Sequence, residues 1–128
     1  MPQDNRVEIF KLSEILSKLD NINSYFLTLL SSNSTAIGII RLKRGEKDTQ
    51  PPHATDELYY VIEGSGLIEI DGKNHVIEQG TFILVPANIK HSRPYNIKHQ
   101  VKIPGRQHIR YAVGRYASFH QIATVQHH

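Results

Sequence analysis

Residues 51–66 read PPHATDELYYVIEGSG, and this stretch decides the fold of the chain. Its later part, ELYYVIEG at 57–64, is rich in aromatic and β-branched residues and therefore predicts a β-strand. His53 and Glu57 stand four residues apart where that strand begins. Side chains alternate between the two faces of a strand, so the even offset places both groups on one face. Such a pair is a candidate for metal binding.

Other residues near this strand are judged by the direction in which they point. Thr55, Tyr59 and Val61 share the parity of Glu57, so we expect them on the same face. Thr55 and Tyr59 are candidates to hydrogen-bond a substrate, with simple core packing as the alternative for Tyr59. Gln50 is a weaker third candidate, and Tyr60 should face the opposite side.

The residues on either side predict further short strands and one helix. Leu12, Ile15, Leu16 and Leu19 recur at helical spacing, which predicts a helix near 13–19 with Ser13 as its cap. Strands are expected at 24–31 and 35–43, and RGEKDTQPP at 44–52 is expected to be a loop. Later segments with strand or turn patterns are a hairpin over 65–80 that turns at Asp71-Gly72, TFILVP ending at Pro86, and alternating residues over 97–103 and 109–113.

Eight or nine short strands with tight turns predict an all-β, antiparallel sandwich or jelly-roll barrel. His91 follows a separate strand and could join His53 and Glu57 inside such a barrel. Two histidines and one carboxylate would leave coordination positions open for water and substrate. This donor set is associated with non-haem iron and also suits manganese, zinc, nickel or copper. The spacing thus allows a divalent-metal cofactor, with the alternative that His53 and His91 are ordinary surface histidines, since the chain has eight His.

Two motifs resemble those of the cupin superfamily. In the first, Gly45 opens the motif, His53 and Glu57 take the second His and the Glu places, and Gly64 closes it. The second, GTFILVPANIKHSRPYN at 80–96, matches at Gly80, Pro86 and His91 with the spacings intact. The resemblance covers roughly residues 35–96.

This sequence departs from the cupin pattern at three positions. Pro51 stands where the first His of the first motif belongs, and its side chain cannot coordinate a metal. Asn88 replaces the usual Gly, and Tyr95 takes the place of the final Asn. The resemblance thus implies a metal site with three ligands, where cupins typically have four. His99 and His108 are weaker candidates for a fourth ligand, and His75 is expected at the surface.

The resemblance implies a double-stranded β-helix (jelly-roll/cupin) barrel with one short N-terminal helix. We divide the chain into an N-terminal helix and strand at 1–34 (a possible dimer arm), a barrel at 35–116 and a tail at 117–128. Small cupins commonly form homodimers in which N-terminal strands extend a neighbour's sheet. We therefore expect a homodimer.

Fold does not fix function, so three hypotheses stay open. The first is a metal-dependent enzyme of oxygenase or isomerase type that acts on a small organic molecule, with metal ligands His53, Glu57 and His91. The second is a non-catalytic binding module or sensor, with or without metal. The third is an interaction protein that uses its basic tail.

Composition narrows these hypotheses. The chain has no Cys, which excludes disulfides, thiolate metal sites and thiol catalysis. No signal-peptide pattern or membrane-length apolar run is present, so we expect a cytoplasmic protein without membrane contact. Phosphate-loop, dinucleotide and nucleophile-elbow motifs are also missing.

Charge is divided unevenly along the sequence. Residues 1–78 carry twelve acids and eight Lys/Arg, whereas residues 79–128 carry seven Lys/Arg and no acid. The basic residues are spread singly and no nucleic-acid motif accompanies them, so nucleic acid is an unlikely partner. We expect the basic half to dock on acidic residues of the same fold or of a partner subunit. If part of it reaches the barrel mouth, an anionic small-molecule ligand is favoured.

Overall fold

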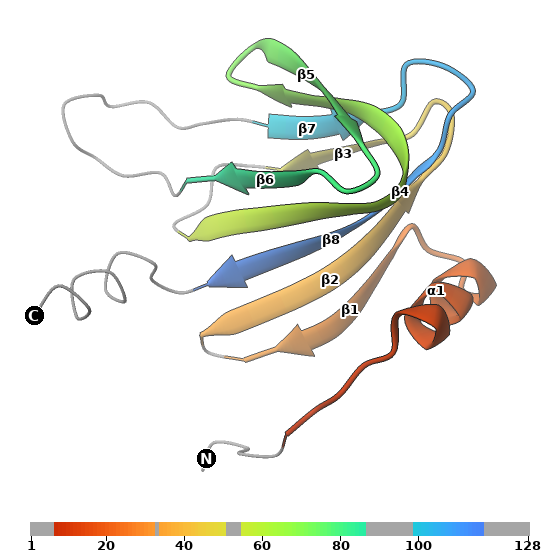
Figure 1. Cartoon of the computed structure of the whole chain (residues 1–128), viewed down its shortest axis with the longest axis vertical. Coiled ribbons are helices and arrows are strands. Elements are labelled where there is room, and N and C mark those ends of the chain that lie inside the picture. Colours follow the sequence, from red (N-terminus) through yellow and green to blue (C-terminus); the bar gives the residue numbers. More distant parts are fainter. Residues whose placement is uncertain (1–6, 33, 51–54, 87–98, 117–128) are drawn as a thin grey trace, which may run out of the picture.

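The computed structural model describes residues 7–32, 34–50, 55–86 and 99–116. In this part of the chain one helix precedes eight strands (Figure 1). No helix among these residues is long and apolar enough to span a membrane. The elements are α1 (Leu12–Asn21), β1 (Phe26–Ser31), β2 (Thr35–Leu42), β3 (Lys47–Gln50), β4 (Asp56–Ile70), β5 (Lys73–Glu78), β6 (Phe82–Val85), β7 (His99–Lys102) and β8 (Ile109–Tyr116).

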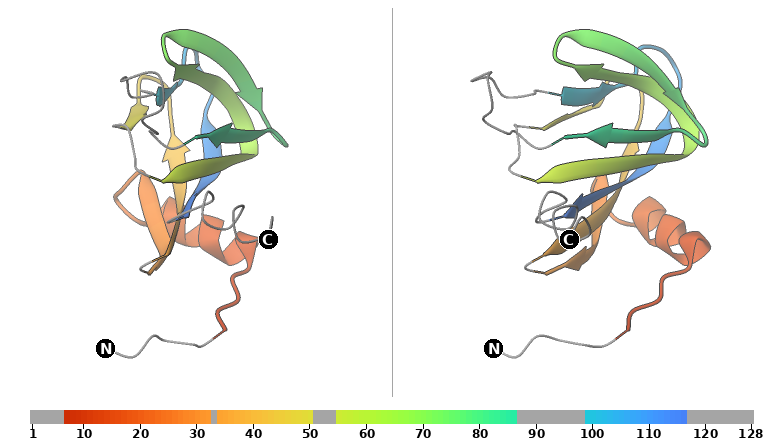
Figure 2. Two further views of the ribbon diagram at one scale, coloured as in Figure 1. Left: turned by 90° about the vertical axis from the view of Figure 1, so that its left-hand side faces the viewer. Right: turned by 60° about the vertical axis from the view of Figure 1, so that its left-hand side comes forward.

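All strand pairs are antiparallel, and together they form one strongly curled sheet. The hydrogen-bonded order is β1-β2-β8-β4-β7-β3, and β5 and β6 also pair with β4. Figure 2 shows the sheet bending round so that β3, β6 and β7 lie across from β1 and β2. The mostly-β, half-barrel architecture with one N-terminal helix confirms the predicted fold class.

Strand β4 is the longest element and forms the bend of the barrel. Its first part pairs with β6 and β8, and its last part pairs with β5 and β7. The register shifts between Val61 and Glu63, and Gly64 adopts a positive φ of 80°. A Cβ at Gly64 would clash with the backbone carbonyl of His108, so the bend requires glycine here.

The hydrophobic core fills the concave side of the sheet. Its members come from β2, β4, β5, β6, β7, β8 and the loop after β7. The buried core residues on this side are Ile40, Leu42, Tyr59, Val61, Ile68, Ile77, Val85, Val101, Ile103, Ile109 and Tyr111. This face therefore also encloses the polar site described below.

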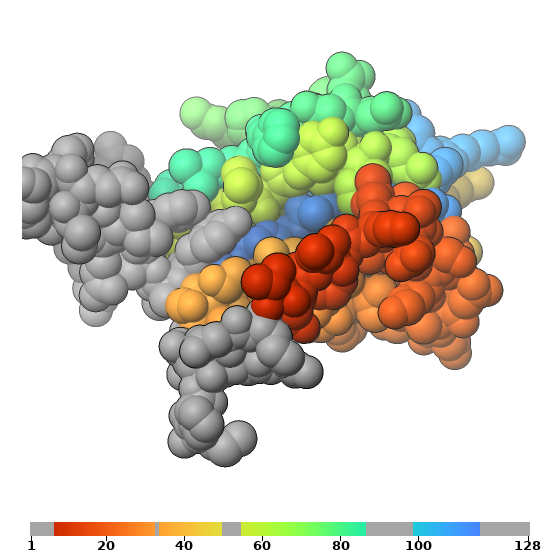
Figure 3. Space-filling view, turned by 60° about the horizontal axis from the view of Figure 1, so that its bottom comes forward, coloured from red at the N-terminus to blue at the C-terminus, as the bar shows by residue number. Residues whose placement is uncertain are grey.

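Helix α1 covers the convex side of the sheet. Ile15 and Leu19 are buried against Ile39 of β2, and Ile62 and Ala112 lie at the edge of the same cluster. Figure 3, which brings this side forward, shows α1 in orange-red against the sheet. The amphipathic pattern that predicted the helix thus supplies its contact with the sheet.

Three local expectations were wrong. The segment 44–52 contains strand β3, which pairs with β7, and is not only a loop. The strand predicted at 57–64 does not end there, because β4 (Asp56–Ile70) runs on without a break into the first arm of the predicted hairpin. The helix cap is Lys11, without a side-chain cap, and Ser13 lies inside the helix.

Three of the four described basic residues of the C-terminal half pair with acidic residues of the same fold, which confirms the expectation for these three. Lys102 pairs with Glu69 at 2.7 Å, Arg110 with Glu63 at 3.1 Å and Arg115 with Glu57 at 2.8 Å. All three acids are on β4, beside which β7 and β8 lie. The hydrogen bond from Lys102 is the main cause that lowers the pKa of Glu69.

Candidate functional site

Glu57 points into the barrel from the first part of β4. Its residue surface is only 1% exposed, and Tyr59 and Val61 are equally buried on the same face. Thr55, at the entry to the strand, is half-buried. Tyr60 lies on the other face, with its ring 4.5 Å from that of Phe82. The alternation predicted for this strand is therefore confirmed.

The Glu57 carboxylate contacts the guanidinium group of Arg115 and the imidazole ring of His99. The Arg115 Nε donates a hydrogen bond of 2.8 Å to Oε2, and the two residues are directly opposite in the β4–β8 register. His99 of β7, itself buried, places Nε2 at 3.0 Å from Oε1. Burying an ionised carboxylate is costly unless opposite charge and hydrogen bonds compensate it. Arg115 supplies both.

Tyrosines extend this polar group across the barrel. The Tyr59 hydroxyl shares a hydrogen bond of 2.8 Å with His99 Nε2. On β8, the Tyr111 hydroxyl donates a hydrogen bond of 2.8 Å to Oδ2 of the buried Asp48 on β3. The two tyrosine rings are 5.6 Å apart, which brings both hydrogen-bonded groups into one interior site.

Both tyrosine hydroxyls keep their protons at neutral pH. Burial is the largest cause that raises the pKa of Tyr59, and the negative charges of Glu57 and Asp48 raise it further. Burial and then Asp48 raise the pKa of Tyr111 well above its ordinary value. Each hydroxyl therefore keeps its single proton, which Tyr111 donates to Asp48, while the Tyr59 hydroxyl shares its hydrogen bond with His99.

A cavity of about 270 Å³ adjoins the site at β1, β2 and β8. Asp48 and Arg115 line it together with apolar side chains such as Ile40 and Val113. The Arg115 side chain is 37% exposed although its Nε contacts the buried Glu57. Arg115 thus connects the interior carboxylate to a space that could accept a small molecule.

The predicted site residues are only partly covered by the described ranges. His53 and His91 lie outside them, and so does the side chain of Gln50, although its backbone pairs with His99. Glu57 and Tyr59 meet in the interior site. His108 lies elsewhere, on the surface near Glu63, and the side chain of His75 is exposed.

Sequence reasoning missed Asp48, Tyr111 and Arg115 and rated His99 only as a weak ligand. Three of these residues could have been found from the alternation of inward- and outward-facing side chains along their strands. His99 shares parity with the buried Val101, and Tyr111 and Arg115 share parity with the buried Ile109. Asp48 gave no such signal, because the polar sequence KDTQ does not have the composition of a strand.

Glu57 and His99 are spaced as two neighbouring donors to a divalent ion would be, but His99 Nε2 would have to exchange its hydrogen bond with Tyr59 for the ion. Two donors at right angles around an ion with bonds of about 2.1 Å are about 3.0 Å apart, and their Oε1 and Nε2 atoms are separated by 3.0 Å. His99 Nδ1 is buried and has no hydrogen-bond partner among the described residues. Within these residues no group of three or more His, Asp or Glu side chains could hold a metal ion. Further ligands would have to come from elsewhere in the chain.

The family pattern described as cupin domain matches residues 38–113, which is more than half of the chain. The chain belongs to the cupin family. The matched region includes the strands that carry Asp48, Glu57, His99 and Tyr111. In this cupin, the polar site lies on the concave side of the family's barrel.

Curated relatives include proteins of known and unknown function. This cupin is 28% identical to an uncharacterized protein of Streptomyces coelicolor over 85 residues, which are 66% of this chain and 81% of that protein. It is 30% identical to the dimethylsulfoniopropionate lyase DddW of Ruegeria pomeroyi over 87 residues, or 67% of this chain. The match spans about half of the lyase, 51% of its length.

Solved structures confirm the double-stranded β-helix fold. A cupin protein from Bacteroides fragilis superposes with a TM-score of 0.65 at 15% sequence identity. The superposition covers 92% of this cupin and 89% of that chain. At this identity the likeness shows the fold alone.

Proposed function

We propose that this cupin binds a divalent metal ion inside its barrel and converts a small organic molecule by oxygenase- or isomerase-type chemistry. His53, Glu57 and His91 would hold the ion, with His99 as the candidate fourth ligand beside Glu57, and the ion could be Fe, Mn, Zn, Ni or Cu. When bound, the ion supplies Lewis-acid chemistry or, as iron, redox chemistry. The similarity to a lyase supports an enzymatic role for the barrel.

The observation that carries this proposal is the burial of Glu57 beside His99. The Glu57 residue is only 1% exposed, so its carboxylate is not there to interact with solvent. An imidazole nitrogen of His99 lies 3.0 Å from it. Arg115 fixes the orientation of the carboxylate through its hydrogen bond to Oε2. Groups that orient a ligand in this way strengthen metal binding.

The other interior groups suit a substrate with oxygen atoms. Tyr59, in its protonated form, would donate a hydrogen bond to a substrate oxygen in place of His99, and Thr55 and Gln50 are further candidates to bind the substrate. Arg115 lines the cavity, and its guanidinium can bind a carboxylate. A cavity of about 270 Å³ favours a substrate of only a few heavy atoms, since drug-sized ligands occupy larger sites.

Metal content tests the proposal. We expect the purified, reconstituted protein to contain one divalent ion per chain by elemental analysis. Glu57→Gln and His91→Ala should each weaken binding by at least about tenfold, because each removes a ligand. His75→Ala, an exposed histidine on β5, is the matched control and should bind as the wild type does. Circular dichroism checks that the variants fold.

A wild-type protein that takes up no divalent ion would overturn the metal-dependent function. Equal weakening by His75→Ala would also overturn it, because binding would then be unspecific.

A second candidate function is a non-catalytic small-ligand sensor. The hydrogen bond from Arg115 to Glu57 favours it, because this pair balances the carboxylate charge without an ion. Calorimetry with small carboxylates in the presence of a chelator separates the two functions. Tight binding under these conditions, without turnover when metal is restored, would favour the sensor.

A further inference from the structure

A second hollow lies outside the barrel interior, and most of its wall is positively charged. It has a volume of about 540 Å³ and is lined by the end of α1, the turn between β2 and β3, the loop after β7 and the start of β8. We call it the basic pocket. The side chains that define it here are Asp20, Arg41, Lys43, Arg44, Arg106 and Arg110.

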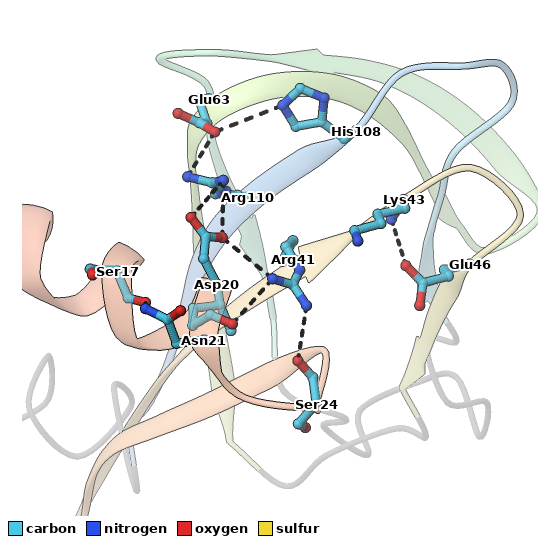
Figure 4. Close-up of polar contacts among 11 residues, drawn as sticks. Ser17, Asp20, Asn21, Ser24, Arg41, Lys43, Glu46, Glu63, His108 and Arg110 are labelled. Atoms are coloured by element: carbon cyan, nitrogen blue, oxygen red, sulfur yellow. Dashed lines mark hydrogen bonds and ion pairs between the residues drawn. The ribbon is translucent and has the colours of Figure 1, made fainter.

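Carboxylates offset only part of this charge. Asp20 contacts both Arg41, at 3.4 Å, and Arg110, at 3.0 Å. Figure 4 shows these two arginines reaching Asp20 from different strands, with Glu63 on the far side of Arg110. Five cationic side chains line the wall against Asp20, with Glu63 and Glu46 beside it, so the wall keeps a positive excess.

Three of the cations have side chains without an ion pair in the described ranges, although the backbone N–H of Lys43 donates a hydrogen bond to Glu46 Oε1 (Figure 4). Lys43, Arg44 and Arg106 are exposed and make no ion pair with any described residue. Arg110 Nε is buried and lacks a hydrogen-bond partner within the described ranges. The exposed side chains of Lys43, Arg44 and Arg106 can therefore face a ligand, whereas the buried Nε of Arg110 is closed off from the pocket.

We propose that the basic pocket binds a small molecule that carries two or more phosphoryl groups. Arginine donors match phosphoryl oxygens in a forked geometry, and a concave wall of one sign strengthens the attraction. A single carboxylate would leave most of the cations unmatched. The cations converge on one hollow instead of forming a stripe, which favours a compact anion over a nucleic-acid backbone.

Inorganic pyrophosphate is the probe, titrated by calorimetry into the full chain after removal of metal ions. We expect saturable binding, with orthophosphate at least about tenfold weaker because it engages fewer cations. The double variant Arg44→Glu/Arg106→Glu should weaken pyrophosphate binding by at least about tenfold. Neither side chain has an ion pair to lose, so the fold should be unaffected.

The matched control is Lys11→Glu/Lys73→Glu, which changes the net charge equally at two exposed sites away from the pocket. It should change affinity by less than about twofold, because exposed charges at a distance are screened by salt. Absence of binding by the wild type, or equal weakening in both double variants, would overturn the proposal. So would an RNA oligonucleotide that binds more tightly than pyrophosphate and is not displaced by it.

Discussion

The Tyr59 hydroxyl lies among buried groups, two of which are negatively charged carboxylates. Because the pKa of Tyr59 is raised in the folded protein, the folded state keeps its proton at a pH where the unfolded chain releases it. The stabilising contribution is complete below pH 10 and is lost as the pH rises above it. Tyr111 adds to the effect in the same direction.

Tyr59→Phe should therefore flatten the alkaline loss of stability. We expect the free energy of unfolding, measured in urea at several pH values above about 9, to fall less steeply than in the wild type. Val61→Ala is the control, since it removes buried volume from the same strand without a titratable group. It should lower stability at every pH and keep the wild-type slope. Identical slopes for all three proteins would refute the argument.

For single residues, the alternation of side chains along a strand was enough to predict from the sequence that Glu57 and Tyr59 face the barrel interior. Arg115 escaped because an arginine is usually assigned to the surface, even though it shares parity with the buried Ile109, and its partner Glu57 is identified only by the strand register. His99 is a similar case: its contact with Glu57 joins two strands far apart in sequence.

Among the elements, β4 carries the strongest backbone constraint. Gly64 and Gly72 share a positive φ of about 80°, but only Gly64 is crowded by neighbouring backbone atoms. Substituting each glycine by alanine therefore separates two costs: the backbone strain of a positive φ, which both positions share, and the steric clash, which only Gly64 has.

Gly64→Ala should destabilise the protein more than Gly72→Ala. We expect Gly72→Ala to cost about 1 kcal/mol through its backbone conformation alone. Gly64→Ala should cost at least about 3 kcal/mol, because the added Cβ also meets the His108 carbonyl. Chemical denaturation measures both. Equal losses would show that the bend can shift to relieve the contact.

Strands with aromatic or β-branched composition, such as 57–64, were predictable, and so was the Asp71-Gly72 turn. β3 was not predictable, because its four polar residues become a strand only by pairing with β7. The continuity of β4 through Gly64 also depends on tertiary contacts, since glycines ordinarily suggest a turn.

At the scale of the whole molecule, we propose that the protein is a homodimer formed through its N-terminal region. Val7 and Ile9 are each 86% exposed, and Phe10 is also exposed, in a segment that extends away from the sheet. In the described sheet order, β1 is at one end. Exposed apolar side chains beside a sheet edge are a recognised setting for association.

Sedimentation velocity at micromolar concentration should show a dimer. Replacing Val7, Ile9 and Phe10 by serine should shift the population toward monomer, because the dimer would lose buried apolar area. Val76→Ser, at an exposed residue on β5, should leave it dimeric. A wild type that sediments only as a monomer would contradict the prediction.

The position of β8 between β2 and β4 has a consequence for synthesis on the ribosome. The inner edges of β2 and β4 can be paired only by a strand that is translated after both of them. A nascent chain that ends before residue 109 therefore exposes two unpaired strand edges and the apolar side chains beside them. Folding is expected to finish only after β8 leaves the exit tunnel, and chaperone binding should be greatest just before that moment.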